Sequence, residues 1–303
     1  MNALKRAYDY VELPTKLASV LPFFTAIAYC FFLLSGTGYA LHVSSTLLFF
    51  AAMLLFDMTT TMINNYIDRR QSGKQGYFSR PVMLAMIFCA LLPAAAIGVY
   101  LAWHYGIVFL LAGIFCFFIG ITYTFGPMPI SRSSYGELFS GLTLGLVLPF
   151  LVVTINTPAL VQLTLTGWTA SLTLDFLGLI KLVLVCAPLV LCISNIMLAN
   201  NICDYEADKA TRYTLPRHIG IENGIRLFTA LYVFCYLAIV AAVAAGAIPW
   251  LSLFVLLTAL PVSRNVRRFN EKQVKSQTFA LSVKNFLTII TPYAISIFAG
   301  TIL

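Results

Sequence analysis

Charged residues are scarce in this sequence. Only 10% of its 303 residues are Asp, Glu, Lys or Arg, whereas 60% are hydrophobic. A soluble domain of this length needs a surface on which about a quarter of the residues are charged. The scarcity of charge therefore excludes a soluble globular protein.

Linkers and reactive cysteine motifs are also absent from the sequence. The seven cysteines contain no CxxC spacing, and we expect them to act as small buried hydrophobes. No Gly/Ser-rich or low-complexity segment divides the chain, which predicts a single domain over residues 1–303. The first apolar run is longer than the core of a signal peptide, and no convincing small-residue cleavage site follows it, so we expect it to be retained.

Apolar stretches of about 20 residues, long enough to span a bilayer as helices, fill the chain instead. The mean hydropathy is +0.90. This pattern predicts an all-α, multi-pass protein of the cell membrane. Its nine predicted transmembrane helices are Leu17–Gly36, Ser45–Tyr66, Pro81–Trp103, Tyr105–Phe125, Gly136–Thr154, Gly178–Ile202, Asn223–Gly246, Ile248–Val262 and Phe286–Leu303.

The basic residues are strongly segregated by this predicted topology. All but one of the 19 Lys and Arg residues fall before, between or just inside helices at one face of the bundle, and Lys181 alone lies near the other. By the positive-inside rule, that face is cytoplasmic, with the N-terminus inside and the C-terminus outside. The net charge of +8 thus sets topology and attracts lipid headgroups, and we expect no nucleic-acid partner.

Two similar polar motifs interrupt the apolar pattern. NNYIDRRQSG begins at Asn64 and NNICDYEADK at Asn200, each at the cytoplasmic end of a predicted helix. On the first helix, Asp57, Thr61, Asn64 and Asp68 share one face. Asp57 lies about 16 Å deeper than Asp68, inside the hydrocarbon, where an acid usually faces a cavity or a partner.

The second motif contains paired acids. Asp204 and Asp208 are four residues apart and therefore neighbours on one helical face. Two carboxylates repel each other unless a cation lies between them, and Mg²⁺ prefers such oxygen ligands together with substrate phosphates and water. The predicted metal ligands are Asp68, Asp204, Asp208, Asn64 and Asn201.

Basic residues follow both acidic motifs. Each alone is explained by the positive-inside rule, but beside the acids they describe a site for a magnesium-bound anion, because Arg can hold phosphate oxygens in bidentate fashion. A diphosphate head on a long hydrocarbon tail fits such a site at the mouth of an apolar bundle. The predicted substrate-binding residues are Asn64, Asn65, Arg69, Lys74, Tyr123, Arg132, Asn200, Asn201, Lys209 and Arg212.

These motifs resemble those of a known family. NNYID, NNICDYEAD, RYTLP (212–216) and YTFGP (123–127) are similar to segments of the UbiA superfamily of intramembrane prenyltransferases. RYTLP and the longer FDMTTTMINNYID (56–68) are most similar to its 1,4-dihydroxy-2-naphthoate polyprenyltransferases of menaquinone synthesis. The resemblance implies a helical bundle around a central cavity. It also implies Mg²⁺ as cofactor, a prenyl diphosphate and an aromatic acid as substrates, and catalytic roles for Asp68, Asp204 and Asp208.

The first motif departs from the family pattern NDxxDxxxD. Its matching positions are Asn65, Asp68 and Ser72, so Asp68 is its single carboxylate. We add Asp57 to the catalytic set, because an acid at that depth could accept a hydrogen bond or a proton from a hydroxyl of the acceptor ring. The alternative is a structural contact with a neighbouring helix.

Two other functions compete with this interpretation. One is prenyl transfer to a different aromatic acceptor, such as 4-hydroxybenzoate. The other is membrane transport along the intramembrane Asp and Asn residues. A transporter would not need two acid–base clusters of diphosphate size on one face, which favours the enzyme.

Overall fold

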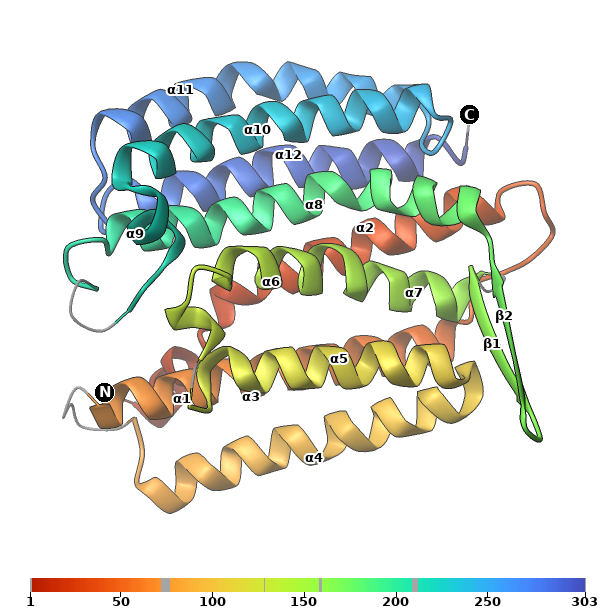
Figure 1. Ribbon diagram of the computed structural model, residues 1–303, viewed down its shortest axis with the longest axis horizontal. Helices are drawn as coiled ribbons and strands as arrows, with labels where there is room; N and C mark the ends of the chain where they lie inside the picture. The colour runs from red at the N-terminus through yellow and green to blue at the C-terminus, as the bar shows by residue number, and fades with distance from the viewer. Residues whose placement is uncertain (1, 72–76, 128, 158–159, 209–211, 303) are drawn as a thin grey trace.

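The structure is a computed structural model, which describes residues 2–71, 77–127, 129–157, 160–208 and 212–302. Long helices lie side by side, with the N-terminus at one end of the bundle and the C-terminus at the other (Figure 1). The elements are α1 Ala3–Val11, η1 Leu13–Lys16, α2 Leu17–Leu34, α3 Val43–Gln71, α4 Arg80–Tyr105, α5 Ile107–Thr124, η2 Ile130–Arg132, α6 Gly136–Leu142, η3 Thr143–Val147, α7 Leu148–Asn156, β1 Val161–Thr166, β2 Thr169–Leu174, α8 Phe176–Cys203, α9 Leu215–Ile219, α10 Ile221–Ala244, η4 Trp250–Thr258, α11 Ala259–Glu271 and α12 Phe279–Ala299.

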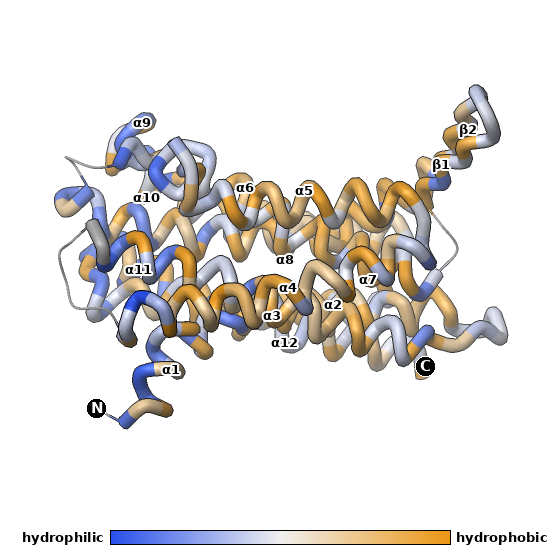
Figure 2. The backbone as a smooth tube through the Cα atoms, turned by 90° about the horizontal axis from the view of Figure 1, so that it is seen from below, coloured by the Kyte–Doolittle hydropathy of each residue, from blue (hydrophilic) through white to orange (hydrophobic). Residues whose placement is uncertain are grey.

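The predicted membrane class is confirmed. The described residues contain eight helical segments long and apolar enough to cross a bilayer. Hydrophobic residues dominate the middle of the bundle, and hydrophilic ones gather around α1 and α9 (Figure 2). The eight segments are Ala3–Leu34, Val43–Arg69, Arg80–Tyr105, Ile107–Thr124, Gly136–Asn156, Phe176–Cys203, Ile221–Ala244 and Phe279–Ala299.

The predicted helix at 248–262 has a different form. Its first part is the 3₁₀ segment η4, which continues into α11 and so carries the helix on to Glu271. Arg264, Arg267 and Arg268 therefore lie on a helix, and the predicted end of this helix at Val262 is wrong. The physical reason is amphipathicity, since Val262, Asn265, Val266 and Phe269 of α11 are buried while the arginines are exposed. This segment is not among the eight, so the count of nine stays a prediction.

The segment between the predicted helices Gly136–Thr154 and Gly178–Ile202 contains a β-hairpin. Strands β1 and β2 pair antiparallel between Val161↔Leu174 and Thr166↔Thr169. Their Val and Thr residues favour extended backbone. The hairpin projects from the end of the bundle opposite the N-terminus (Figure 1), and so it lies far from the two polar motifs.

A very tight turn joins α4 and α5. Gly106 alone separates the two helices, with φ +85°, a conformation that L side chains rarely adopt. This one-residue connection makes α4 and α5 antiparallel neighbours beside α3 (Figure 1). The predicted spans at 81–103 and 105–125 correspond to these two helices.

Helix α8, which carries the second motif, packs closely against the membrane-spanning segment Gly136–Asn156. A Cβ on Gly145, in the π-helical turn η3, would lie 2.5 Å from the backbone nitrogen of Val190 in α8. Small residues at such crossings let helix backbones approach within a membrane. At the other side of α8, the Tyr293 hydroxyl of α12 donates to the Val185 carbonyl at 3.0 Å. Helix α8 is therefore fixed from both sides.

We expect Gly145→Ala to destabilise the protein by about 1–3 kcal/mol, because the added methyl group must push α8 away. Gly113→Ala on α5 is the matched control, since a methyl group added there would meet nothing within 4 Å. The control should be neutral or slightly stabilising, as Ala favours helix over Gly. Thermal unfolding in one detergent compares the two, and equal midpoints would contradict the packing argument.

Candidate functional site

The two polar motifs meet at one end of the bundle, here called the charged end and defined by Asp68, Asp204 and Asp208. The Arg212 Nη2 lies 3.7 Å from Asp68 Oδ2, and its Nε lies 3.5 Å from Asp208 Oδ1. One guanidinium thus contacts an acid from each motif. The N–H of Asp208 donates to the Asp204 carbonyl at 2.9 Å, so these acids follow each other by one helical turn.

Two further cations complete the acid–base cluster. The Arg132 Nη2 lies 3.7 Å from Asp68 Oδ1, and the Arg132 carbonyl accepts a 2.8 Å hydrogen bond from the Tyr213 N–H. Lys275, just before α12, forms an ion pair with Asp204. The sequence pattern placed Lys275 among the general basic residues and gave no sign that it belongs to the site. Each of the three aspartates therefore has a cationic partner.

Asp208 is the least satisfied acid of the cluster. Its side chain is 12% exposed, and no hydrogen-bond donor among the described residues contacts its buried Oδ2. Burial raises the pKa of the Asp208 carboxyl above its ordinary value. Arg212 opposes this increase, whereas the charges of Asp204 and Asp68 add to it. A second cation beside Asp208 would stabilise its ionised form.

The carboxylate oxygens of the three aspartates are suitable ligands for Mg²⁺, although in this structure they form ion pairs with Arg and Lys side chains. In the described parts of the chain, no three His, Cys, Asp or Glu side chains gather closely enough to form a metal cluster. The three aspartates are nevertheless close enough to interact electrostatically, because the charges of Asp204 and Asp68 both raise the pKa of Asp208. Carboxylate oxygens, one of them without a donor, are the ligands that Mg²⁺ takes together with substrate phosphates.

The asparagines of the motifs hold helices together. The Asn65 Nδ2 donates to the Tyr10 carbonyl and to Glu12 Oε1, both at 3.0 Å, which ties α3 to the N-terminal segment. The Asn201 Nδ2 donates to Glu137 Oε1 on α6 at 2.8 Å. These contacts make Asn65 and Asn201 positioning residues of α3 and α8.

The remaining predicted residues that the structure describes make other contacts. Asn64 accepts a 3.3 Å hydrogen bond from Thr124 of α5, and Asn200 accepts one from the N–H of Asp204 through its backbone carbonyl at 3.0 Å. The Arg69 guanidinium lies 3.6 Å from the ring centroid of Tyr77, a cation–π contact in the segment after α3. Lys74 and Lys209 are outside the described residues.

Glu137 is a site residue that the sequence pattern did not reveal. It is 4% exposed at the start of α6, and its Oε2 meets no hydrogen-bond donor within the described residues. An acid in the first turn of a helix is common, because it favours the helix dipole, and so gives no functional signal. A methyl group added at neighbouring Gly136 would lie 3.7 Å from the Tyr123 hydroxyl. Tyr123 and Glu137 therefore belong to one wall of the site.

Asp57 forms a partly buried ion pair with Lys16. Lys16, 4% exposed, donates from Nζ to Asp57 Oδ1 at 2.7 Å and also to Thr61 Oγ1. The Ser19 hydroxyl donates to Asp57 Oδ2. Asp57 thus has a partner of the kind that the structural alternative requires, and this partner is a lysine that directly precedes α2. Segment η1 carries Lys16 into the bundle beside α3, where each charge compensates the other.

Sequence comparisons identify relatives over most of the chain. The model of the UbiA prenyltransferase family matches residues 21–290. The 1,4-dihydroxy-2-naphthoate octaprenyltransferase of Bacillus subtilis (strain 168) is 30% identical over 247 residues, which cover 75% of this chain and 73% of that protein.

Solved structures share the fold. A UbiA homolog from Aeropyrum pernix K1 superposes with a TM-score of 0.64 at 20% identity, covering 91% of this chain and 97% of the homolog. A UbiA homolog from Archaeoglobus fulgidus bound to GPP and Mg²⁺ gives a TM-score of 0.63 at 13% identity, covering 98% of this chain and 100% of the homolog. The predicted bundle architecture is thereby confirmed.

Proposed function

The chain belongs to the UbiA prenyltransferase family and is a prenyltransferase, and we propose that its acceptor is 1,4-dihydroxy-2-naphthoate. In this reaction a polyprenyl group passes from a prenyl diphosphate to the acceptor ring, with loss of the ring carboxylate as CO₂ and release of diphosphate. The product is demethylmenaquinol, an intermediate of menaquinone synthesis. The similarity to a naphthoate octaprenyltransferase supports this acceptor over 4-hydroxybenzoate.

One observation carries the proposal for the diphosphate end. Asp68, Asp204 and Asp208 come from two distant motifs and lie in a single acid–base cluster at the charged end. When bound there, Mg²⁺ would neutralise charge that develops on the departing diphosphate. The same aspartates would hold it, as expected for a homolog of a protein that binds GPP and Mg²⁺.

The basic residues of the cluster bind the phosphate groups of the substrate. Arg132 and Arg212 each lie 3.5–3.7 Å from an aspartate oxygen, and a guanidinium at this position can hold phosphate oxygens in bidentate fashion. The apolar bundle keeps water from the allylic carbon as it becomes cationic, and aromatic faces such as that of Tyr123 stabilise that charge.

Asp57 lies deeper along the same face of α3, where Lys16 of η1 pairs with it, and the two charges suit the acceptor. Eleven residues of helix place Asp57 about 16 Å from Asp68, too far to share its metal. A hydroxyl of the acceptor ring can donate to Asp57, and the buried Lys16 ammonium offers charge complementary to a carboxylate. The pair would orient the acceptor below the prenyl diphosphate.

Mass spectrometry tests the acceptor directly. Purified protein receives Mg²⁺, an isotope-labelled prenyl diphosphate and equal amounts of 1,4-dihydroxy-2-naphthoate and 4-hydroxybenzoate. We expect a labelled naphthoquinol product that has lost the mass of CO₂. Labelled 4-hydroxybenzoate as the main product would contradict the proposed acceptor while leaving prenyl transfer intact.

We also propose that the charged end faces the cytoplasm, with the C-terminus outside. All but one of the 19 Lys and Arg residues fall on one side of the predicted topology, and the two termini lie at opposite ends of the bundle (Figure 1). Termini on opposite sides of a membrane require an odd number of membrane-spanning segments, which supports η4 together with α11 as a ninth segment beside the eight. A reporter fused after Leu303 should be active only outside the cytoplasm, and cytoplasmic activity would overturn this orientation.

A further inference from the structure

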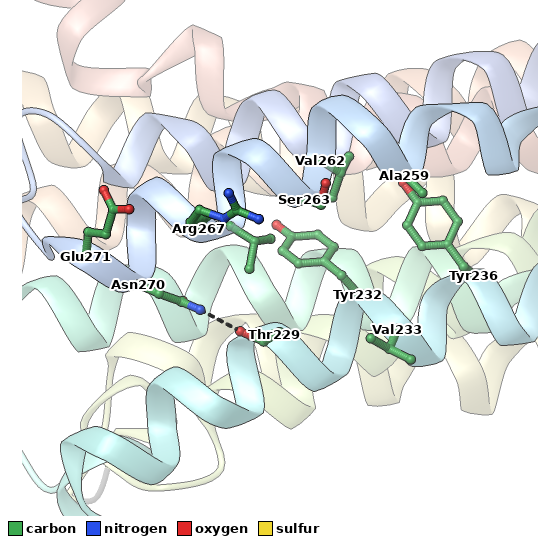
Figure 3. Close-up of a pocket in the computed structure, with 11 residues that line it drawn as sticks. Thr229, Tyr232, Val233, Tyr236, Ala259, Val262, Ser263, Arg267, Asn270 and Glu271 are labelled. Carbon is green, nitrogen blue, oxygen red and sulfur yellow. Dashed lines mark hydrogen bonds between the residues drawn. The ribbon is translucent and has the colours of Figure 1, made fainter.

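A groove separates α10 from α11 on the charged half of the bundle, away from the aspartate cluster. Its volume is about 540 Å³ (Figure 3). Two hydrogen bonds join the helices around it. The Asn270 Nδ2 of α11 donates to Thr229 Oγ1 at 3.0 Å, and the Tyr236 and Thr258 hydroxyls are 2.9 Å apart. The groove runs along the helix axes between these two contacts.

The groove has an apolar part and a charged part. Val262 and Val266 are buried along α11, and Val233 on α10 is 54% exposed at the edge. Toward the end of α11, the lining residues Arg267 and Glu271 are exposed. This order matches a membrane lipid, whose acyl chains lie in the hydrocarbon and whose headgroup lies at the interface.

Arg267 and Glu271 carry opposite charges one helical turn apart, about 6 Å along the axis. Within the described residues, neither forms an ion pair within 4 Å, although opposite charges at this spacing often do. An anionic headgroup would satisfy Arg267 and be repelled by Glu271. A headgroup with both a phosphate and an ammonium would satisfy both.

We propose that this groove binds phosphatidylethanolamine from the surrounding bilayer. Its phosphate contacts Arg267, its primary ammonium donates to Glu271, and one acyl chain lies along Val233 and Tyr236. Phosphatidylcholine has no N–H to donate, and phosphatidylglycerol has no cation for Glu271. The site is separate from the aspartate cluster and does not depend on the proposed acceptor.

Native mass spectrometry of the detergent-purified protein, with each lipid added at equal concentration, tests this site. We expect phosphatidylethanolamine adducts to exceed those of phosphatidylcholine and phosphatidylglycerol. Arg267→Gln should weaken retention of phosphatidylethanolamine several-fold. Glu271→Gln should also weaken it several-fold, but should leave phosphatidylglycerol retention unchanged or increased.

Arg268→Gln is the matched control, because Arg268 is exposed on the same helix and does not line the groove. It should retain the wild-type adduct pattern. All three variants alter exposed side chains, so we expect each to elute as a monodisperse, folded protein. The proposal is overturned if phosphatidylglycerol binds as well as phosphatidylethanolamine, if Glu271→Gln leaves phosphatidylethanolamine retention unchanged, or if Arg268→Gln weakens it as much as Arg267→Gln.

Discussion

The Asp208→Asn variant should lose about 10²–10³-fold in prenyl-transfer turnover, the range seen when one preorganised electrostatic contact is removed from an active site. Asparagine keeps the shape of Asp208 but removes the charge that would hold a magnesium-bound diphosphate. Arg212 keeps its second partner, Asp68, so we expect the fold to survive. Turnover is measured with saturating acceptor and labelled prenyl diphosphate.

Glu222→Gln is the control for this effect of charge. Glu222 is an exposed acid in the first turn of α10, and its neutralisation changes the net charge equally. This variant should turn over at the wild-type rate. The assignment of Asp208 fails if Asp208→Asn is as active as Glu222→Gln at limiting Mg²⁺.

The Asp57→Asn variant should lose most of its turnover and also some stability. Its neutral amide leaves Lys16 buried without a counter-charge, and breaking a buried pair from one side costs about 3–5 kcal/mol. A single substitution therefore mixes a folding effect with a functional one. Thermal unfolding and turnover must be measured on the same preparation.

The double variant Lys16→Gln/Asp57→Asn separates the two effects. Removing both charges should restore much of the lost stability, since no unpaired charge remains. If the pair orients the acceptor, the double variant stays inactive, with a raised KM for the acceptor and unchanged binding of prenyl diphosphate. Recovery of both stability and turnover would show that the pair is only structural.

Patterns local in sequence predicted much of this fold. Apolar runs of membrane-spanning length predicted the helices, because each helix satisfies its own backbone hydrogen bonds whatever its neighbours are. The spacing of Asp204 and Asp208 predicted neighbouring acids, and the structure has them one turn apart. The 3₁₀ geometry of η4 was not predictable, because η4 packs against both α10 and α12. The amphipathic spacing of α11, by contrast, could have shown that this helix continues beyond Val262.

The partners of the site residues could not be read from the sequence. Lys16 and Asp57 are 41 positions apart, and Lys275 and Asp204 are 71 apart. A lysine near the first helix has the same local pattern whether it is solvated or buried. Glu137 was missed for a similar reason, since its contact with Asn201 joins helices 64 positions apart.

The central claim is that the two motifs bind one metal–diphosphate group. The most direct measurement is an experimental structure of the protein with Mn²⁺ in place of Mg²⁺ and an unreactive prenyl thiolodiphosphate. We predict anomalous density for Mn²⁺ among Asp68, Asp204 and Asp208, with phosphate oxygens on Arg132 and Arg212. A diphosphate bound elsewhere, or Mn²⁺ that contacts none of the three aspartates, would contradict the account.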